Sequence, residues 1–320
     1  MIGLGIGASN ASAIFLPKEG WQTLYNTVPS NMVDLHAFEA KDAKGGSPES
    51  IQSYIERSNQ AFAFLQKQIE TYRPDAVIIV GADRDQMFSH INTPSFYAFT
   101  GKEFTAAQGV VDLPESVKGT VTIPGSEELA TFMVKNLVKK GFEMSWGSEF
   151  KPMGNRSQAS ISHSIGALAQ KLTPALKTPI IPVLINAYFP PQPTADRCFA
   201  LGTAIREVIG ERSERVAIVA SGGLSYDPQG RWVDEPFDRW IIDNLTSGKI
   251  EELKKLFKID SENLRGPTGE IRSWITVAAA CQRSANIIDY IPARQAKTGL
   301  CFAYWPATSN MPSEISIKWR

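Results

Sequence analysis

Short, continuous apolar runs alternate with amphipathic segments along the chain. Four runs that have the length of a strand are 2–8, 76–81, 179–185 and 215–220. A strand that is apolar at every position is typical of a sheet with both faces covered. Apolar residues that recur mostly every three or four positions predict helices at 48–72, 127–139 and 194–209, and a largely helical region from 235 to about 283. Further strands are expected at 143–146 and 299–305. This alternation predicts an α/β fold, a single domain over 1–320 with a mostly buried central sheet flanked by helices.

Polar loops follow the predicted strands directly, and functional residues of α/β sheets lie where strands end. These loops are 9–12, 82–88, 186–191 and 221–226. A fifth polar segment, around His163, leads into a helix. The adjacent glycines Gly222 and Gly223 come straight after a buried strand, which indicates either a tight turn or a close approach of the backbone to a ligand. We therefore expect the chemistry of this protein in these five segments.

Three local features each allow two interpretations. The glycine-rich segment GLGIGAS at 3–9 has GxGxG spacing, and no GxxG step follows it to begin a helix. Close packing of the strand backbone is therefore favoured over a nucleotide site. Asp83 and Arg84 form either a solvated ion pair or a site that presents a guanidinium to a substrate carboxylate. Glu270 opens an apolar helix, where an acid also interacts favourably with the helix dipole. Arg197 and Asp238 are expected to form an ordinary ion pair.

Composition excludes several classes of function. The chain has 33 Lys and Arg against 33 Asp and Glu, and this balance argues against nucleic acid and against a polybasic membrane anchor. No uncharged apolar run reaches the length of about 18 residues that a membrane span needs. The three cysteines form no CxxC pair, which argues against a zinc ribbon and favours a reducing cytoplasm. Only three histidines, His36, His90 and His163, are available for metal or acid–base chemistry.

Several segments, taken in order, resemble one family across nearly the whole chain. RPDAVIIVGADRDQMF at 73–88 is similar to a segment in which a strand is followed by an Asp-His pair, and PIIPVLINAYFPPQPTADRCFALGTAIR at 179–206 is similar to a strand, proline loop and helix. ASGGLSY at 220–226 and GEIRSW at 269–274 resemble two further motifs. The family is that of LigB-type (class III) extradiol ring-cleavage dioxygenases, represented by the catalytic subunit of protocatechuate 4,5-dioxygenase. The resemblance implies the fold of that subunit.

The departures from the family pattern fall on its metal site. Members bind Fe(II) through two histidines and a glutamate, which leaves positions open for a catechol and for oxygen. The resemblance places Asn10 and Arg84 where the two ligand histidines stand, and it places Glu270 at the glutamate. Tyr226 stands where the family has its acid–base histidine, whereas a further active-site histidine is kept as His163. Arg84 has a permanent charge and no lone pair for a metal, so the sequence predicts that no metal is bound and that Arg84 occupies the cation position beside Glu270.

These replacements favour an enzyme that has kept the fold and lost the iron cofactor. We expect metal-independent acid–base chemistry on a phenolic or 1,3-dicarbonyl carboxylic acid: C–C cleavage, hydrolysis, decarboxylation or tautomerisation. Arg84 would bind a carboxylate or enolate, His163 or Glu270 would act as the base, and Tyr226 would donate a hydrogen bond. The residues expected to bind substrate are Ser9, Asn10, Ser12, Asp83, Tyr188, Gly222 and Gly223.

Two alternatives stay open at this point. One is a non-catalytic subunit that pairs with an active ring-cleaving dioxygenase. The other is a true Fe(II)-dependent dioxygenase for substrates of the catechol, protocatechuate or gallate type. In either case the resemblance implies a small aromatic or aromatic-derived acid as ligand and a homodimer or higher oligomer, possibly with a homologous subunit.

Overall fold

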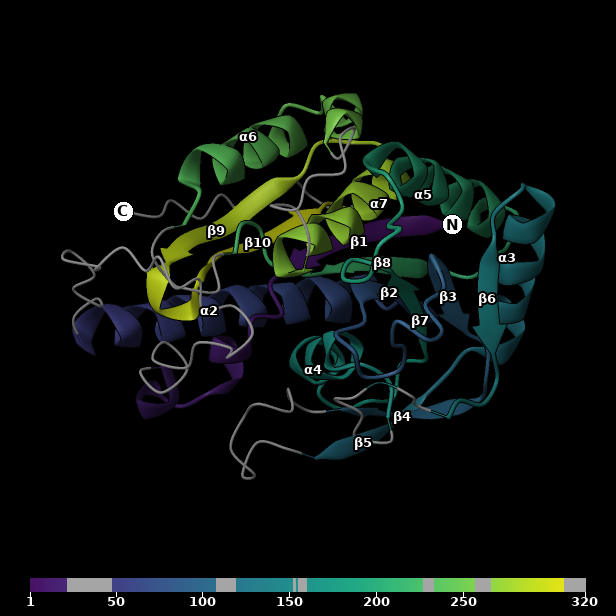
Figure 1. Cartoon of the computed structure of the whole chain (residues 1–320), viewed down its shortest axis with the longest axis horizontal. Coiled ribbons are helices and arrows are strands. Elements are labelled where there is room, and N and C mark those ends of the chain that lie inside the picture. The colour runs from purple at the N-terminus through teal and green to yellow at the C-terminus, as the bar shows by residue number, and fades with distance from the viewer. Residues whose placement is uncertain are drawn as a thin grey trace.

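The computed structural model describes residues 1–21, 48–107, 119–151, 154, 160–226, 233–256 and 266–307. His36 and the segment 227–232 lie outside these ranges. Within them the chain forms a large central sheet with helices on both faces, and a second, two-stranded sheet lies on one of these faces (Figure 1). The predicted fold class, an α/β domain with a buried central sheet flanked by helices, is therefore confirmed.

The central sheet has eight strands in the order β6-β3-β7-β2-β8-β1-β10-β9. Their bounds are β1 Ile2–Ala8, β2 Ala76–Ala82, β3 Phe96–Phe99, β6 Met144–Gly147, β7 Ile180–Ile185, β8 Val216–Ser221, β9 Asn286–Ala293 and β10 Thr298–Trp305. The four central strands, β7, β2, β8 and β1, are mutually parallel and buried at every residue. The strands outside them introduce antiparallel pairs, β3 with β7 and β10 with both β1 and β9. All four central strands correspond to the apolar runs seen in the sequence.

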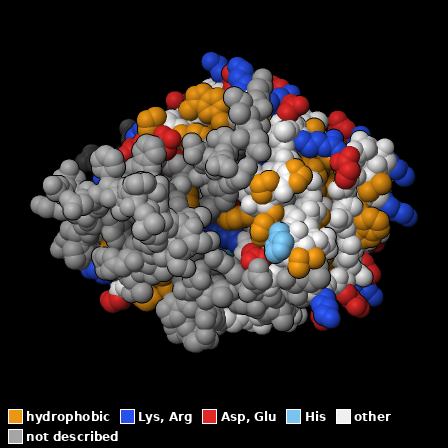
Figure 2. Space-filling model, in the orientation of Figure 1, with side chains coloured by type: hydrophobic (Ala, Val, Ile, Leu, Met, Phe, Trp, Pro, Cys, Tyr) orange, Lys and Arg blue, Asp and Glu red, His pale blue; other side chains and the backbone are white. Residues whose placement is uncertain are grey.

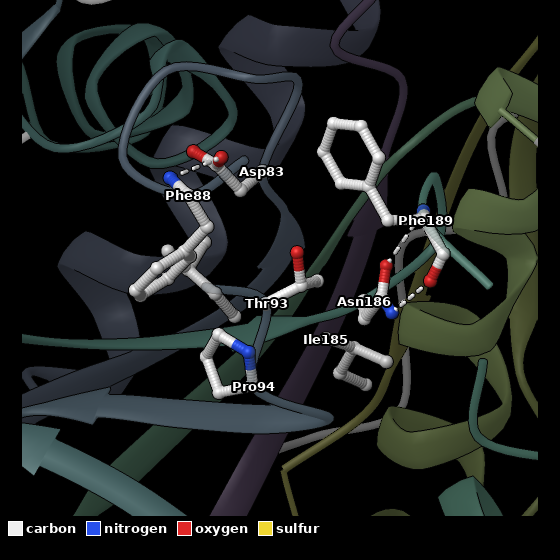
Figure 3. Close-up of a pocket in the computed structure, with 8 residues that line it drawn as sticks. Asp83, Phe88, Thr93, Pro94, Ile185, Asn186 and Phe189 are labelled. Atoms are coloured by element: carbon white, nitrogen blue, oxygen red, sulfur yellow. Dashed lines mark hydrogen bonds between the residues drawn. The ribbon is translucent and has the colours of Figure 1, made fainter. Parts of the chain in front are cut away.

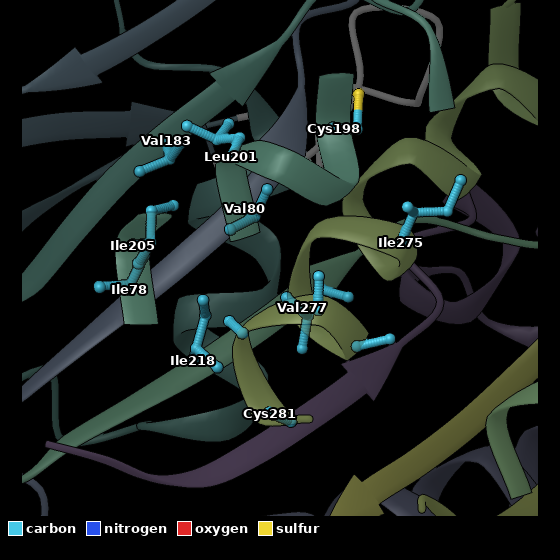
Figure 4. Close-up of a cluster of buried hydrophobic side chains, with 14 of the residues drawn as sticks. Ile78, Val80, Val183, Cys198, Leu201, Ile205, Ile218, Ile275, Val277 and Cys281 are labelled. Atoms are coloured by element: carbon cyan, nitrogen blue, oxygen red, sulfur yellow. The ribbon is translucent and has the colours of Figure 1, made fainter. Parts of the chain in front are cut away.

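Each face of the sheet supports its own hydrophobic core. Side chains alternate along β2, so that Ile78 and Val80 join one core whereas Val77 and Ile79 join the other. Figure 4 shows the first core, where Ile78, Val80 and Ile218 of the sheet meet side chains of α5 and α7. The helices on this face are α3 Glu127–Lys139, α5 Ala195–Gly210, α6 Glu235–Thr246 and α7 Ile271–Cys281, with the 3₁₀ turns η4 Ile250–Lys255 and η6 Gly266–Glu270.

The second face is covered by two helices and the small sheet. These elements are α2 Pro48–Tyr72, α4 His163–Leu172, and the hairpin of β4 Glu103–Ala107 with β5 Thr120–Pro124. The 3₁₀ turns η1 Ser12–Phe15 and η7 Arg294–Ala296 complete the described elements. The hydrophobic pattern did not indicate β3, β4, β5 or β9. β3 has only four residues, and β9 mixes exposed, half-buried and buried positions without regular alternation, so neither gives a clear periodic signal.

The glycines of β1 pack directly against side chains of neighbouring elements. A Cβ at Gly5 would lie 2.3 Å from the Sγ of Cys281, and one at Gly7 would lie 2.3 Å from the ring of Trp274. Close packing, which the sequence favoured over a nucleotide site, therefore explains the GxGxG spacing. Cys198, Cys281 and Cys301 are free and buried. No helix in the described part of the chain is long and apolar enough to cross a membrane.

Asp238 is a buried connection between three elements of the first face. Its carboxylate accepts hydrogen bonds from the backbone N–H of Ser225 at 2.7 Å, from the Ser225 hydroxyl at 3.0 Å and from the Tyr290 hydroxyl at 2.7 Å. Asp238 thus ties α6 to β9 and to the loop after β8. The expected ion pair with Arg197 was wrong, because Arg197 bonds Glu143 at 2.8 Å. Burial raises the pKa of Asp238 to about 6, although these hydrogen bonds oppose the shift.

Replacing Asp238 by Asn should change how stability depends on pH. A carboxyl whose pKa is 3.8 when unfolded and about 6 when folded favours the folded state most when it is protonated. The free energy of unfolding of the wild-type protein, relative to Asp238→Asn, should therefore rise by up to about 3 kcal/mol as the pH falls from 7 to 4. Urea unfolding at several pH values measures this. Asp243→Asn, an exposed change on the same helix, should keep the wild-type dependence, and a pH-independent difference for Asp238→Asn would contradict the assignment.

Candidate active site

The carboxyl ends of the four central parallel strands meet at one edge of the sheet, and the predicted loops converge there. Ser9 and Asn10 follow β1, Asp83 and Arg84 follow β2, and Tyr188 lies in the loop after β7. The loop 222–226 follows β8. Because parallel neighbours end at the same edge, this arrangement brings residues from distant parts of the sequence together. Glu270 reaches the same place from the end of η6, at the start of α7.

The centre of the site is an ion pair between Arg84 and Glu270. The Nε of Arg84 donates to the Oε1 of Glu270 at 2.7 Å, and the Arg84 Nη2 donates to the Oδ1 of Asn10 at 3.2 Å. The Glu270 side chain is fully buried and that of Arg84 is 15% exposed. Glu270 forms no side-chain hydrogen bond to the N-terminus of its own helix. The guanidinium thus bridges the two residues that the family resemblance placed beside it.

A directional series of hydrogen bonds holds Asn10 in place. Because Arg84 donates to the amide oxygen of Asn10, the amide nitrogen is free to donate, and it lies 3.1 Å from the Oγ of Ser221. The Ser221 hydroxyl in turn donates to the backbone carbonyl of Ser164 at 2.5 Å. The ends of β1 and β8 are therefore fixed to the first turn of α4, where His163 also lies.

Tyr188 provides a second donor to the buried carboxylate. Its hydroxyl lies 2.6 Å from the Oε1 of Glu270. The loop is held by Asn186, whose Oδ1 accepts from the backbone N–H groups of Tyr188 and Phe189 at 3.2 and 3.0 Å. The sequence predicted Tyr188 as a substrate-binding residue and did not predict this contact with Glu270.

Burial and the neighbouring charges together determine the protonation of Arg84 and Tyr188. Burial opposes the charge of Arg84, but the Glu270 carboxylate, Tyr188 and Tyr226 together outweigh it and raise the pKa of the guanidinium above its usual value. Burial also raises the pKa of Tyr188 well above its ordinary value, so this phenol stays protonated. The second oxygen of Glu270, Oε2, is buried and has no hydrogen-bond partner among the described residues.

Glycine is required where the loop after β8 passes Glu270. A Cβ at Gly222 would lie 2.9 Å from the Cβ of Glu270, and one at Gly223 would lie 2.8 Å from the Oγ1 of Thr298. The two glycines therefore allow the backbone to lie directly against the carboxylate residue and the start of β10.

The remaining predicted residues occupy different positions around this centre. The side chain of Tyr226 is half-buried, and this tyrosine contributes to the electrostatic environment of both Arg84 and Tyr188. Ser9 is buried behind Gly223, with its Oγ 3.7 Å from a Cβ built there. Ser12 is the first residue of η1.

Asp83 shapes the loop that carries Arg84. Its carboxylate accepts the backbone N–H groups of Gln86, Met87 and Phe88, at 3.1, 3.0 and 3.0 Å. Burial raises the pKa of Asp83 to about 6, with these hydrogen bonds opposing the shift. Gln86 was not singled out in the sequence, yet its Oε1 lies 2.8 Å from the Nδ1 of His163. The same loop thus supports Arg84 and contacts His163.

A narrow, largely apolar pocket lies between the loop 83–94 and the loop 186–189 (Figure 3). It is lined by Asp83, Phe88, Thr93, Pro94, Leu184, Ile185, Asn186 and Phe189. The carboxylate of Asp83 and the amide of Asn186 already bond backbone groups, so this pocket offers mainly apolar surface. Figure 2 shows a depression on this face of the molecule with a basic side chain at its base. No cluster of three or more His, Cys, Asp or Glu that could hold a metal occurs in the part of the chain that the structure describes.

Comparison with known proteins decides the family. The family model for the catalytic LigB subunit of aromatic ring-opening dioxygenase matches residues 43–291. This chain belongs to the LigB family. The prediction from the sequence motifs is thereby confirmed, and the curated relatives of this LigB-family chain carry dioxygenase names.

Two of these relatives are 2,3-dihydroxyphenylpropionate/2,3-dihydroxicinnamic acid 1,2-dioxygenases. The protein of Photorhabdus laumondii subsp. laumondii is 27% identical over 186 residues, which cover 58% of this chain and 52% of the relative. That of Azotobacter vinelandii is 26% identical over 207 residues, which cover 64% and 55%. The chain thus spans about half the length of the curated relatives it matches. The crystal structure of the uncharacterized protein JW3007 from Escherichia coli K12 has a similar fold, with a TM-score of 0.51 at 16% identity over 94% of this chain and 99% of that one.

The Arg84–Glu270 pair should show strong energetic coupling. Arg84→Met leaves a buried carboxylate without its cation and should cost about 3–5 kcal/mol of stability. Adding Glu270→Gln removes the uncompensated charge, so the double variant should recover most of that loss. Chemical unfolding of the wild type, both single variants and the double variant gives the coupling energy. Additive single effects would show that the two side chains do not depend on each other.

Proposed function

We propose that this LigB-family chain is an enzyme for a phenolic or 1,3-dicarbonyl carboxylic acid that works by metal-independent acid–base chemistry. The observation that supports the proposal is the position of the Arg84 guanidinium, 2.7 Å from Glu270 and 3.2 Å from Asn10. Polar and charged groups, rather than apolar side chains, occupy the positions that the family pattern gives to metal ligands. A site that had only lost its function would have no need to keep a buried carboxylate.

The donor set around Glu270 does not fit an Fe(II) ion. An iron site of this family needs two imidazole nitrogens beside the carboxylate, whereas this chain offers an amide and a guanidinium. The guanidinium has no lone pair to give and its charge repels a cation. Arg84 also uses the Oε1 of Glu270, the oxygen that the Tyr188 hydroxyl contacts as well. We therefore assign no step of the reaction to a metal.

The chain's own residues supply what acid–base chemistry needs. A guanidinium has five N–H donors, of which Arg84 uses one toward Glu270 and one toward Asn10, leaving three for a substrate carboxylate or enolate. Tyr226 contributes a phenol that donates more readily than it accepts a proton. His163 or Glu270 is the base. The apolar pocket beside Asp83 suits the non-polar part of the substrate.

Turnover of a panel of hydroxybenzoic acids and 1,3-dicarbonyl acids tests the proposal. Chromatography measures how much of each acid is consumed and an oxygen electrode measures oxygen uptake, both with and without a chelator. We expect at least one acid to be consumed without oxygen uptake. Arg84→Lys keeps the charge opposite Glu270 and loses the planar donor fork, and Tyr226→Phe loses the phenol, so each should lower turnover by about 10²-fold or more. His90→Gln, an exposed change outside the site, should keep wild-type turnover. Unchanged turnover in Arg84→Lys and Tyr226→Phe would contradict the roles assigned to Arg84 and Tyr226.

A second candidate, ring cleavage by oxygen, is favoured by the dioxygenase names of the curated relatives. The same experiment separates the two. Oxygen uptake that depends on a catecholic acid and is abolished by the chelator would support the dioxygenase and contradict metal-independent chemistry.

A further inference from the structure

We propose that Gln86 is a positioning residue that fixes the tautomer of His163, so that the Nε2 of His163 is the base of the site. The role of His163 as a base rests on the proposed function. The tautomer rests on hydrogen-bond geometry alone. It also decides between the two candidate bases, His163 and Glu270.

The orientation of the Gln86 amide follows from one backbone contact. The backbone N–H of His163 lies 2.9 Å from the atom assigned as the Oε1 of Gln86. A backbone N–H can only donate, so the atom it faces must be an acceptor, the carbonyl oxygen. If the amide were turned around, its NH₂ group would face the backbone N–H of His163, and two donors would oppose each other. The Ser162 hydroxyl, 2.9 Å from the same oxygen, is compatible with this assignment.

The protonation of the His163 ring follows from that oxygen. The Nδ1 of His163 lies 2.8 Å from the Oε1 of Gln86. An amide oxygen has no hydrogen to give, so Nδ1 must carry the proton and donate it. In the neutral ring the lone pair is then on Nε2, which is the only ring atom that can take a proton. An imidazole held in one tautomer by its second nitrogen is the arrangement that general bases use.

The surroundings hold Gln86 firmly enough for this role. Gln86 is 1% exposed, and its backbone N–H donates to Asp83 at 3.1 Å, in the loop that Asp83 organises. His163 is the first residue of α4, whose N-cap is Ser162. Gln86 thus lies in the loop directly after β2, and His163 lies at the start of α4. The Nε2 of Gln86 is buried and has no partner among the described residues, so the three contacts on Oε1 hold the amide in an orientation that leaves its nitrogen without one.

Glu270 is less suited to be the base. Its Oε1 already accepts from Arg84 at 2.7 Å and from Tyr188 at 2.6 Å. Protonating Glu270 would weaken the ion pair that compensates the charge of Arg84. Its structural role therefore conflicts with taking a proton during turnover.

Nitrogen-15 NMR of the imidazole rings tests the tautomer directly, because the chain has only three histidines. Variants of His36 and His90 assign the His163 signals. Spectra of the neutral ring should show a protonated Nδ1 and an unprotonated Nε2 in the wild type. Gln86→Glu keeps an acceptor and should keep this tautomer. Gln86→Met keeps the volume, removes the acceptor and should shift the ring toward the Nε2–H form.

Turnover gives the second reading. For an acid that the wild type consumes, Gln86→Met should lower kcat by about 10- to 100-fold with little change in KM, and Gln86→Glu should restore much of it. Gln170→Met, a change at a glutamine of α4, serves as the matched control and should change neither measurement. A wild-type ring protonated on Nε2, or an unchanged tautomer in Gln86→Met, would overturn the proposal. The spectra need no substrate, so the tautomer can be tested even if none of the acids is consumed. A failure of the proposed function can therefore be distinguished from a failure of this inference.

Discussion

The buried carboxylate of Glu270 is the constraint on which the rest of the site depends. A carboxylate with no exposed side-chain surface is stable in a protein only when a cation or several donors compensate it. In this chain the cation is part of the polypeptide, since Arg84 provides it from the end of β2. The neighbouring residues pack around this ion pair. Asn10 accepts a hydrogen bond from Arg84, Tyr188 donates to Glu270, and the glycine pair after β8 lets the backbone pass close to Glu270.

One short loop connects the two halves of the site. Asp83 folds the loop by accepting three backbone N–H groups, and the loop then presents Arg84 toward Glu270 and Gln86 toward His163. The Asp83 carboxylate thus helps to position both Arg84, which we expect to bind substrate, and Gln86, which contacts the proposed base His163. In our account, Asp83 acts on both through the backbone of this loop.

The parts of the fold that the sequence predicted are those with a strong local signal. The strands β1, β2, β7 and β8 are buried on both faces and appear as unbroken apolar runs, whereas β9 mixes exposure classes and was missed. The ion pair of Arg84 with Glu270 joins residues 186 positions apart, which no local pattern reveals. Family motifs suggested it, and the convergence of parallel strand ends explains it physically.

The contacts that were missed depend on tertiary packing. A glutamine in a loop has no sequence signature of its own, and Gln86 meets His163 only because α4 begins beside the loop after β2. The expected pair of Arg197 and Asp238 failed for the same reason, since both residues found nearer partners in Glu143 and in Tyr290 with Ser225. Charge pairing inferred from sequence alone cannot tell which partner packing will bring within reach.

The central claim is that the Arg84 guanidinium holds the cation position of a LigB-type site. The most direct measurement is the iron content of protein incubated anaerobically with Fe(II) and then desalted, with oxygen uptake on protocatechuate and 2,3-dihydroxyphenylpropionate recorded for the same sample. The account predicts far less than one iron per chain and no uptake for the wild type, with iron retained by the double variant Asn10→His, Arg84→His. Stoichiometric iron and rapid oxygen uptake in the wild type would contradict it.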